Sequence, residues 1–565
     1  MPIKRWWVIF VAAALTVAAA ICTLNLTIDP FGVFGDRIYD WYSFNMTKNP
    51  KAAKVSYLDA NHGQYNAYIL GPSSSSSFLP ETLDKYTGLR WYNTFNYGAD
   101  MAYTLELAQY LADSFEVRQF MLVLPYVCAS KYNMPSKDAT EWHAPQISGT
   151  PAAWLRFLFA NPRYSFSKTG DYRSNSYLQE SFDVFLPQSG VYDKSSRDAA
   201  PIGALADYTD FEDNYSLLYD LTEIENCMTA VQALKTLCDG LGIELTVVVP
   251  PLPGLHMAQY NESEISEFYA RLGDITPFHD YARFVPDETR YYYDSSHFRN
   301  NVGNMILADI YGDKSAYIYT DGDELDHELT VLLYHHITSD GADDSTSIAD
   351  FRGNMERIRN CGYTPVSLCD IDAYVYLGKP LPQKPLIIRF DDGYLSNYEL
   401  ALPILEEFGY KAVIFAIGVT VGRDTYKDTS EPITPHFTSE QAREMVAGGL
   451  IEVQSHTYDM HQVQRLDGEN CRIGVLRRSG ESEADYINAL RADFTRSRDE
   501  LESGTGSEVF ALAYPYGQHE QLAEVILSQM GFRITFASEY GVNTLVKGLP
   551  QSLYCLKIQD ISKLT

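Results

Sequence analysis

The chain has 565 residues, of which 45% are apolar and 21% charged, so it is too long for one ordinary core and too apolar for a disordered protein. We therefore expect two or three globular domains. The formal net charge of −30 argues against nucleic acid as a partner, because phosphate binding needs a basic surface, and against adhesion to anionic lipid through a polybasic face.

The first residues predict a membrane anchor. Lys4 and Arg5 precede an uncharged run at 6–28, which is long enough to cross a bilayer as a helix. Positive charge before the run predicts a cytoplasmic N-terminus and places the later residues outside the cell membrane. A cleaved signal peptide is the alternative, because the Ala-rich stretch 12–20 can serve as its apolar region. Residues 1–28 are thus predicted to be a cytoplasmic tip and a single transmembrane helix.

Seven of the eight cysteines follow this run, and one of them must be unpaired in a monomer because seven is odd. They show no CxxC or Cys/His metal spacing. We expect them to be core residues and do not predict a disulfide.

Residues 29–325 are predicted to form an α/β domain. Apolar β-rich runs, typical of buried strands, lie at 68–71, 120–125 and 243–250. Helical apolar spacing lies around 104–113 and 227–241. This alternation indicates a mostly parallel sheet. A stretch rich in Ser, Asn, Tyr and Asp, at about 130–225, is interpreted as an insertion or cap.

Short polar motifs in this domain have the composition of a serine hydrolase site. Ser73 follows the first strand, Asp294 and His297 lie three apart near the end of the domain, and Gly98 lies between. In such a set Ser73 attacks, His297 takes its proton and Asp294 orients the imidazole. The amides of Ser73 and Gly98 are the expected oxyanion donors. The alternative is a Ser-rich loop and a helix cap before residues 298–310.

The strand before Ser73 and the order of these motifs resemble SGNH hydrolase-like proteins, particularly membrane-anchored acyl-transfer proteins that act on cell-wall or exported polysaccharide. The stretch 28–32 is similar to that group. The resemblance implies a three-layer α/β domain with O-acyl esterase or transferase activity. The family's Gly-x-Asn-Asp block is absent, since the corresponding strand ends at 124–126 with Leu-Pro-Tyr. The domain is therefore either an enzyme or a binding or scaffolding relic.

A polar stretch at 319–327 predicts a second boundary, with a second domain over 326–565. Its strands are predicted at 331–337, 386–390, 412–417, 451–455, 510–515, 534–537 and 553–558. Helical segments lie between most of them, for example at 402–408 and 439–447. Seven strands with helical crossovers indicate a barrel-like sheet, in which chemistry is found at the carboxyl ends of the strands.

Three of these strands end in polar residues. Asp391 and Asp392 follow one strand, His456 and His461 follow another, and a Pro-Tyr-Gly turn at 515–517 follows a third. Taken alone, the Asp-Asp-Gly and Pro-Tyr-Gly patterns are more often turns, and two His five residues apart are more often a chance pair. Together, one carboxylate and two neutral imidazoles form a facial set for a divalent cation and leave positions open for water and substrate.

Over about 329–558 these motifs resemble the polysaccharide deacetylases of the NodB-homology type, carbohydrate esterase family four. The resemblance implies a distorted (β/α) barrel with Asp392, His456 and His461 as metal ligands. It also implies Asp391 as general base and the backbone N–H of Tyr514 as an oxyanion donor. The five-residue separation of the two His is similar to the subgroup that deacetylates poly-β-1,6-N-acetylglucosamine. Zinc is the expected metal, with nickel, cobalt and manganese as alternatives.

The acid that protonates the leaving amine is less clearly marked. Many relatives carry a His in a late Leu-x-His strand motif, whereas here that strand contains Cys555 and no His. The remaining candidates are His335, His336, His436 and His519. The resemblance favours His335, because Tyr-His after the first strand recurs in the family.

The sequence therefore predicts a single-span, extracytoplasmic hydrolase that removes N-acetyl groups from N-acetylglucosamine-containing surface polysaccharide. Its first domain is expected to handle O-acyl groups on the same polymer. A non-catalytic glycan-binding or export scaffold is one alternative, and an enzyme acting on peptidoglycan or on a small N-acyl amide is another. The expected partners are acetylated polysaccharide and the membrane, without nucleic acid.

Overall fold

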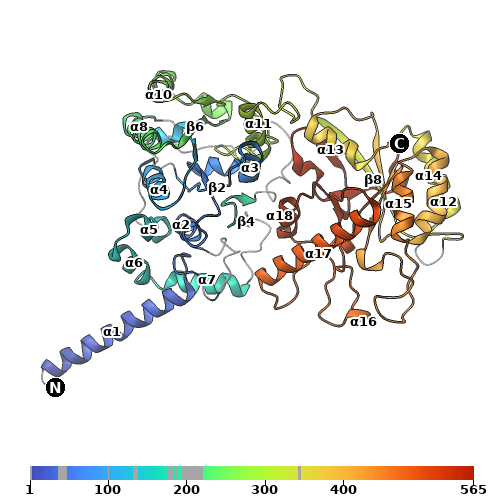
Figure 1. Ribbon diagram of the computed structural model, residues 1–565, viewed down its shortest axis with the longest axis horizontal. Coiled ribbons are helices and arrows are strands. Elements are labelled where there is room, and N and C mark those ends of the chain that lie inside the picture. The colour runs from blue at the N-terminus through green and yellow to red at the C-terminus, as the bar shows by residue number, and fades with distance from the viewer. Residues whose placement is uncertain are drawn as a thin grey trace. The chain divides into compact units, whose positions relative to one another are not determined.

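The computed structural model describes residues 3–35, 38, 47–98, 101–130, 138–174, 184–185, 187–193, 220–341 and 345–565. The chain divides into two compact units, Met1–Lys314 and Ser315–Thr565 (Figure 1). Residues just after this division pack with the second unit, because the backbone N–H of Tyr317 donates to the carbonyl of Tyr376 at 2.9 Å. The division therefore precedes the boundary that the sequence predicts at 325–326.

The N-terminal helix α1 (Ile3–Ile28) contains the predicted apolar run. Its segment Arg5–Ile28 is long and apolar enough to cross a membrane by length and composition, with a mean hydropathy of 2.4 and no buried residues in its most apolar stretch. A signal sequence passes the same test. The end of the helix is different, because the buried Asn25 side chain donates to the carbonyls of Leu158 and Ala160 at 2.9 Å.

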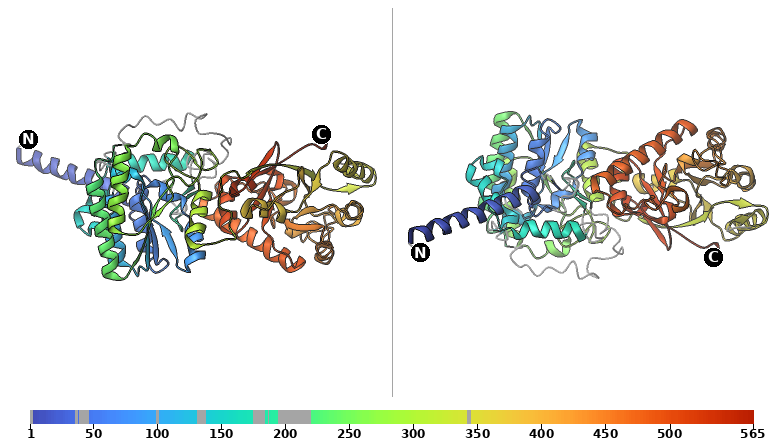
Figure 2. Two further views of the ribbon diagram at one scale, coloured as in Figure 1. Left: turned by 90° about the horizontal axis from the view of Figure 1, so that it is seen from above. Right: turned by 90° about the horizontal axis from the view of Figure 1, so that it is seen from below.

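The first unit contains a five-stranded parallel sheet with the strand order β2-β1-β3-β6-β7. The strands are β1 (Ala67–Leu70), β2 (Trp91–Asn93), β3 (Gln119–Val123), β6 (Glu244–Val249) and β7 (His279–Asp280). Helices lie on both sides of this sheet (Figure 2). They include α2 (Pro50–Ala60), α3 (Pro80–Thr87), α4 (Met101–Ser114), α8 (Ile224–Leu241), α10 (Glu262–Ile275) and α11 (Asn300–Tyr311). The three predicted strands and two predicted helices of this unit are confirmed to within a few residues.

The predicted insertion at 130–225 is only partly described. Its described part contains the short helices α5 (Pro145–Ser148), α6 (Pro151–Leu158) and α7 (Arg163–Ser174) and the strand pair β4 (Val184–Phe185) and β5 (Tyr192–Asp193). Residues 194–219 lie outside the described part of the chain.

The turn after β1 requires glycine. Gly71 has a φ of +142°, and a Cβ atom built on it would lie 2.6 Å from the carbonyl oxygen of Val123 on β3. Only a residue without a side chain allows this close approach. The chain then turns into the 3₁₀ helix Ser73–Ser77, so that Ser73 begins the helix just beyond the carboxyl end of the strand.

The second unit contains a nearly closed, barrel-like sheet with the order β17-β8-β12-β13-β14-β15-β16-β18. The strands are β8 (Asp326–Tyr334), β12 (Pro385–Phe390), β13 (Ala412–Ala416), β14 (Ile451–Ser455), β15 (Ala511–Ala513), β16 (Ile534–Tyr540), β17 (Asn543–Val546) and β18 (Leu556–Ile558). The N–H of Gln559, just after β18, donates to the carbonyl of Val331 on β8 at 2.8 Å, which brings the last strand back to the first. The predicted barrel-like sheet is confirmed.

Strand β8 begins five residues before its predicted start at 331, and β17 has no counterpart in the prediction. Both differences have one cause. β17 pairs antiparallel with the first residues of β8, from Asp326 to Leu329. This ribbon is partly exposed and polar, so it lacks the apolar run that marks a buried parallel strand.

Helices surround the barrel, and their bounds fit local sequence signals (Figure 1). They are α12 (Ile348–Asn360), α13 (Leu368–Leu377), α14 (Leu402–Phe408), α15 (Ser439–Ala447), α16 (Gln464–Asp467), α17 (Glu483–Thr505) and α18 (Gln521–Gln529). Ser367 and Thr438 each form a capping box at the start of a helix. The predicted helices at 402–408 and 439–447 are confirmed.

Candidate functional site

Parallel strands bring the predicted metal ligands to one edge of the barrel. Strand β12 ends at Phe390, and β14 ends at Ser455, which pairs with Ala416 at the end of β13. Asp392 and His456 therefore follow the ends of β12 and β14, which flank β13, on the same side of the sheet. His461 lies on the loop that follows β14, and this loop brings its side chain to the same edge of the barrel.

The three side chains converge on a common point. Oδ1 of Asp392 lies 3.5 Å from Nε2 of His456 and 3.5 Å from Nε2 of His461. Two atoms that are each about 2.1 Å from a tetrahedral cation lie about 3.4 Å apart, so these separations fit a shared ion. The same three residues form a group that could hold a metal.

The buried polar atoms of this group also fit a cation. Oδ1 of Asp392 is buried and accepts no hydrogen bond from any residue that the structure describes. Burying a carboxylate oxygen without a partner is costly, and a bound cation removes that cost. Nδ1 of His456 faces the carbonyl of Ala513 at 2.8 Å, and an N–H donated there leaves Nε2 as a ligand. The residues present therefore fit a divalent metal.

The backbone at this edge is held in an unusual conformation. Asp392, Thr457 and Tyr516 have φ values of 73°, 68° and 58°, in the left-handed region that residues with side chains rarely adopt. Each residue follows a different strand of the barrel. Such strained residues cluster where a surrounding structure holds side chains for function.

Asp391 lies beside the metal group and pairs with a buried arginine. Arg389 donates through Nε and Nη2 to the two carboxylate oxygens at 2.7 and 2.6 Å, and its Nη1 donates to the carbonyl of Ala537. Burial raises the pKa of Asp391, but Arg389 and His456 together hold this pKa below its ordinary value. Asp391 is therefore ionised at neutral pH, as a general base must be.

The buried ion pair makes a prediction about stability. Arg389→Met leaves the Asp391 carboxylate buried without its partner, so we expect the free energy of unfolding to fall by about 3–5 kcal/mol. The matched control is Arg352→Met, which removes an exposed guanidinium paired with Glu407 and should change stability little. Urea unfolding of both variants measures the difference. Equal stability of the two variants would show that the buried pair does not support the fold.

The prediction that the backbone N–H of Tyr514 is the oxyanion donor is wrong. This N–H donates to the carbonyl of Phe536 at 3.0 Å, as part of the sheet between β15 and β16, and is not available to a substrate. Tyr516 is the better candidate. It lies in the first turn of the 3₁₀ helix Pro515–Gly517, where an N–H has no acceptor within the helix. Its ring lies against His461, with centroids 4.2 Å apart.

The structure separates the four candidate acids. His335 is exposed and directly follows Tyr334, the last residue of β8. Nδ1 of His336 is 2.8 Å from the hydroxyl of Ser396. His436 is buried against Tyr394, and burial lowers its pKa to about 4.

The fourth candidate, His519, contacts Cys555 at 3.2 Å, in a different group of residues. The assignment of His335 stays a prediction.

The structure brings together the three predicted residues of a serine hydrolase triad in the first unit. Nε2 of His297 lies 2.7 Å from Oγ of Ser73, and its Nδ1 lies 2.8 and 2.9 Å from the two carboxylate oxygens of Asp294. The hydroxyl of Ser77 donates to the carbonyl of Phe298, the residue after His297. This hydrogen bond links the serine turn, Ser73–Ser77, to the segment that carries His297. This arrangement allows His297 to accept the Ser73 proton.

The sequence prediction gives a role to Gly98 but none to Asn96, a polar residue near Ser73. The N–H of Asn96 donates to the carbonyl of Gly71 at 3.2 Å, which places Asn96 beside the serine turn. Its side-chain oxygen is buried and has no hydrogen-bond partner among the described residues. An unsatisfied buried amide is rare and needs an explanation. Its position after β2, next to the serine turn, is the signal that sequence reasoning could have used.

Among the described residues of the first unit, one hollow borders Ser73 and another borders Gly98. A small cavity of about 70 Å³ borders Ser73 and is closed by apolar and aromatic side chains that include Tyr126, Leu252 and Tyr260. A larger, open cleft of about 1300 Å³ borders Tyr97 and Gly98. Gly98 thus lines a different hollow from Ser73, and its role as an oxyanion donor stays a prediction.

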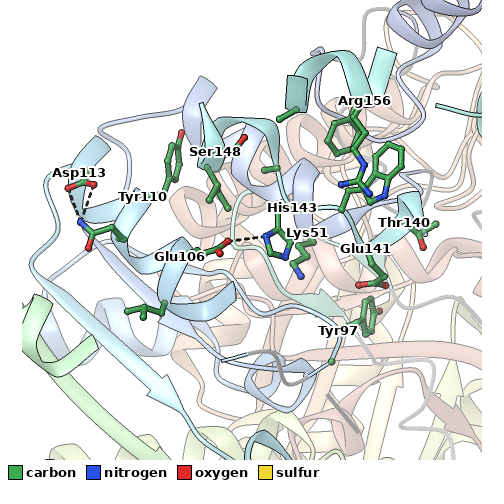
Figure 3. A pocket seen from close by; sticks show the side chains of 18 of the residues that line it. Lys51, Tyr97, Glu106, Tyr110, Asp113, Thr140, Glu141, His143, Ser148 and Arg156 are labelled. Atoms are coloured by element: carbon green, nitrogen blue, oxygen red, sulfur yellow. Dashed lines mark hydrogen bonds and ion pairs between the residues drawn. The ribbon is translucent and has the colours of Figure 1, made fainter. Parts of the chain in front are cut away.

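Charged and aromatic side chains face the larger cleft (Figure 3). Glu106 pairs with His143 at 3.0 Å on one wall. Arg156 lies 4.0 Å from the ring of Trp142 on another. The lining of this cleft is thus a mixture of carboxylates, hydroxyls and aromatic rings.

Comparison with known proteins agrees with the geometry of the second unit. Residues 378–535 match the polysaccharide deacetylase family model, and this range contains Asp391, Asp392, His456 and His461. The second unit carries a polysaccharide deacetylase domain. The deacetylase domain thus includes the strand ends at which the candidate metal ligands meet.

Individual relatives show the extent of the similarity. The chain is 27% identical over 230 residues to the poly-β-1,6-N-acetyl-D-glucosamine N-deacetylase of Escherichia coli, which is 38% of this chain and 34% of that protein. It is 25% identical over 195 residues to the enzyme of the same name from Staphylococcus aureus, which is 34% of this chain and 61% of that protein. The chain thus spans about a third of the length of the E. coli relative.

A solved structure of a de-N-acetylase from Aggregatibacter actinomycetemcomitans shares 26% sequence identity. The match covers 41% of this chain and 94% of that structure, with a TM-score of 0.37.

Proposed function

We propose that the second unit is a divalent metal-dependent de-N-acetylase of N-acetylglucosamine-containing surface polysaccharide. One observation carries the proposal: Oδ1 of Asp392 is buried, receives no hydrogen bond from the described residues, and faces Nε2 of both His456 and His461. The names of the E. coli and S. aureus relatives support poly-β-1,6-N-acetylglucosamine as the substrate. We propose zinc as the metal, with nickel, cobalt and manganese as alternatives that the same ligands accept.

The residues divide the chemistry of amide hydrolysis among them. Asp392, His456 and His461 would hold a divalent metal, which would supply polarisation of the acetamide carbonyl and a lowered pKa of water. Asp391, ionised and held by Arg389, accepts the proton of the attacking water. The Tyr516 N–H donates to the oxygen on which negative charge develops. His335, exposed beside Asp391, gives a proton to the leaving amine.

A panel of acetylated substrates tests the proposal. The full chain, stripped with a chelator and reloaded with zinc, is incubated with β-1,6-linked N-acetylglucosamine oligomers, peptidoglycan fragments and a small N-acyl amide. We expect the β-1,6 oligomers to lose acetyl groups fastest, as counted by mass spectrometry. Faster release from peptidoglycan would favour the peptidoglycan alternative, and no release from any substrate would favour a glycan-binding scaffold.

A second activity is supported by the first unit. We propose that Ser73, His297 and Asp294 form the catalytic set of an SGNH-like esterase or transferase for O-acyl groups on the same polymer. The 2.7 Å contact between Ser73 and His297 favours this activity over a relic. Asn96 supplies a polar side chain near the serine turn, in a domain whose sequence lacks the usual Gly-x-Asn-Asp block. The small cavity beside Ser73 is sized for a short acyl group.

The proposed location follows from α1. The segment Arg5–Ile28 is long and apolar enough to anchor the protein, with Lys4 and Arg5 on the cytoplasmic side. Both units would then lie outside the cell membrane, where exported polysaccharide is found. Two acyl-handling sites on one anchored chain would act on the same polymer at a raised local concentration.

A further inference from the structure

A second group of metal-ligand side chains lies in the deacetylase domain, apart from the group around Asp392. His519, Glu524 and Cys555 bring one ligand atom each to within 4.8 Å of the others. Sγ of Cys555 lies 3.2 Å from Nε2 of His519 and 3.0 Å from Oε1 of Glu524. The residues come from the turn before α18, from α18 itself and from the position just before β18. The group therefore joins a helix and its preceding turn to the sheet.

The His519 ring has the orientation of a metal ligand. Its Nδ1 faces the carbonyl of Gly517 at 3.3 Å. An N–H donated to this carbonyl directs the Nε2 lone pair at Cys555. Metal-binding histidines commonly have this second contact to a carbonyl, and His456 has it with Ala513 in the first group.

The group has more acceptor atoms than protons. Oε1 of Glu524 accepts a hydrogen bond from the hydroxyl of Thr535 at 2.6 Å and also faces the Cys555 thiol. The thiol has one proton, which it donates to Glu524, and in the tautomer whose Nδ1–H donates to Gly517, Nε2 of His519 faces sulfur without a proton between them. A divalent cation resolves this mismatch, because imidazole, thiolate and carboxylate are all its ligands.

A buried hydroxyl lies next to the group. Tyr514 is fully buried, and its hydroxyl lies near the Glu524 carboxylate and the Cys555 thiol. A water in the fourth position of a tetrahedral ion would have this hydroxyl beside it as a hydrogen-bond partner.

We propose that His519, Glu524 and Cys555 bind a second divalent cation of the zinc class, with water as the fourth ligand. The soft thiolate and the imidazole favour zinc over magnesium or calcium. Binding displaces the thiol proton to solvent. The side chains must separate by a few tenths of an ångström, because sulfur and nitrogen ligands of one zinc ion lie about 3.5 Å apart.

The bound ion would stabilise the turn that carries Tyr516. His519 lies two residues after Gly517, the last residue of the 3₁₀ helix Pro515–Gly517. Holding His519 to Cys555 and Glu524 fixes this turn against β18 and α18. The role of the site is structural, and it does not depend on the proposed deacetylase activity.

Cobalt binding to the full chain tests the proposal, because only a sulfur ligand gives a sulfur-to-cobalt charge-transfer band. The chain is stripped of metal, kept reduced and titrated with Co²⁺. We expect two ions per chain, one for each group, and a near-ultraviolet charge-transfer band. The band should persist in Asp392→Asn and disappear in Cys555→Ser, which should bind one ion. The control is Cys369→Ser, which changes an exposed free cysteine and should behave as wild type.

The wild-type protein alone can overturn the proposal, whether or not Cys555→Ser folds. A wild-type chain that binds cobalt without a charge-transfer band has no sulfur ligand, and the proposed second site is then wrong. A band that survives in Cys555→Ser would place the sulfur ligand elsewhere. Loss of the band together with normal deacetylation of glycan would leave the proposed function standing, so the two failures are distinguishable.

Discussion

Asp392→Asn is expected to lower N-deacetylation by about 10³-fold or more, because the metal supplies several kcal/mol of stabilisation to the transition state. The substitution keeps the shape of the side chain but removes the negative charge that faces His456 and His461. We therefore expect it to weaken metal binding as well as turnover. Metal content after dialysis and the rate of acetyl release from an N-acetylglucosamine oligomer measure the two effects.

Two further variants make this result specific. Asp428→Asn changes a carboxylate whose side chain is 98% exposed and should leave metal content and rate unchanged. His461→Ala removes another ligand of the same group and should reproduce the loss seen with Asp392→Asn. If Asp392→Asn retains both metal and activity, the assignment of the metal group is wrong.

Ser73→Ala is expected to abolish the hydrolysis of a small aryl acetate by the first unit, with a loss of about 10⁴-fold or more. The reason is that Ser73 is the only one of the three residues that can attack the ester, while His297 and Asp294 act through it. Amide hydrolysis by the second unit should not change. Initial rates on the aryl acetate and on the N-acetylglucosamine oligomer, measured on the same preparation, test both expectations.

The control for this variant is Ser266→Ala, which removes an exposed hydroxyl on α10 that donates to the carbonyl of Glu262. It should retain both activities. An aryl acetate activity that survives Ser73→Ala but is lost in Asp392→Asn would come from the second unit. The triad in the first unit would then have no esterase function on this substrate.

Much of the second unit could be predicted from its sequence, because its buried parallel strands are continuous apolar runs that end in polar residues. The run before Asp391 and the run before His456 each mark a strand and its carboxyl end. Once parallel strands are assumed, these residues must meet at one edge. That reasoning predicted one carboxylate with two imidazoles, the family resemblance selected Asp392 as the carboxylate, and the structure places all three ligand atoms together.

The choice between two backbone amides could not be made from sequence. Tyr514 and Tyr516 flank the same proline, and the sequence does not show which N–H pairs with the neighbouring strand. The structure shows that the Tyr514 N–H pairs with Phe536, and that Tyr516 has a left-handed φ of 58° at the start of the turn. The direction in which a backbone N–H points depends on sheet register and on the local φ and ψ angles, which the sequence does not show.

The sequence also does not reveal clusters that form between residues far apart along the chain. The prediction that the cysteines are core residues holds for Cys128, Cys227 and Cys238, which are buried, and is wrong for four others, because Cys369 is exposed and Cys361, Cys471 and Cys555 are half-buried. Cys555 is different, because the pairing of β16 with β18 brings it to Glu524 and His519. The sequence spacing of these residues matches no metal motif, so only the fold shows that they meet.

The most direct test of the deacetylase assignment separates the general base from the metal. Zinc-loaded wild type and Asp391→Asn are incubated with a β-1,6-linked N-acetylglucosamine oligomer, and free amines are counted by mass spectrometry at equal, measured metal content. We predict that Asp391→Asn binds zinc at the Asp392 group but releases acetyl groups at least about 10²-fold more slowly, because it cannot accept the proton of the attacking water. Equal release by the two proteins would contradict the proposed mechanism.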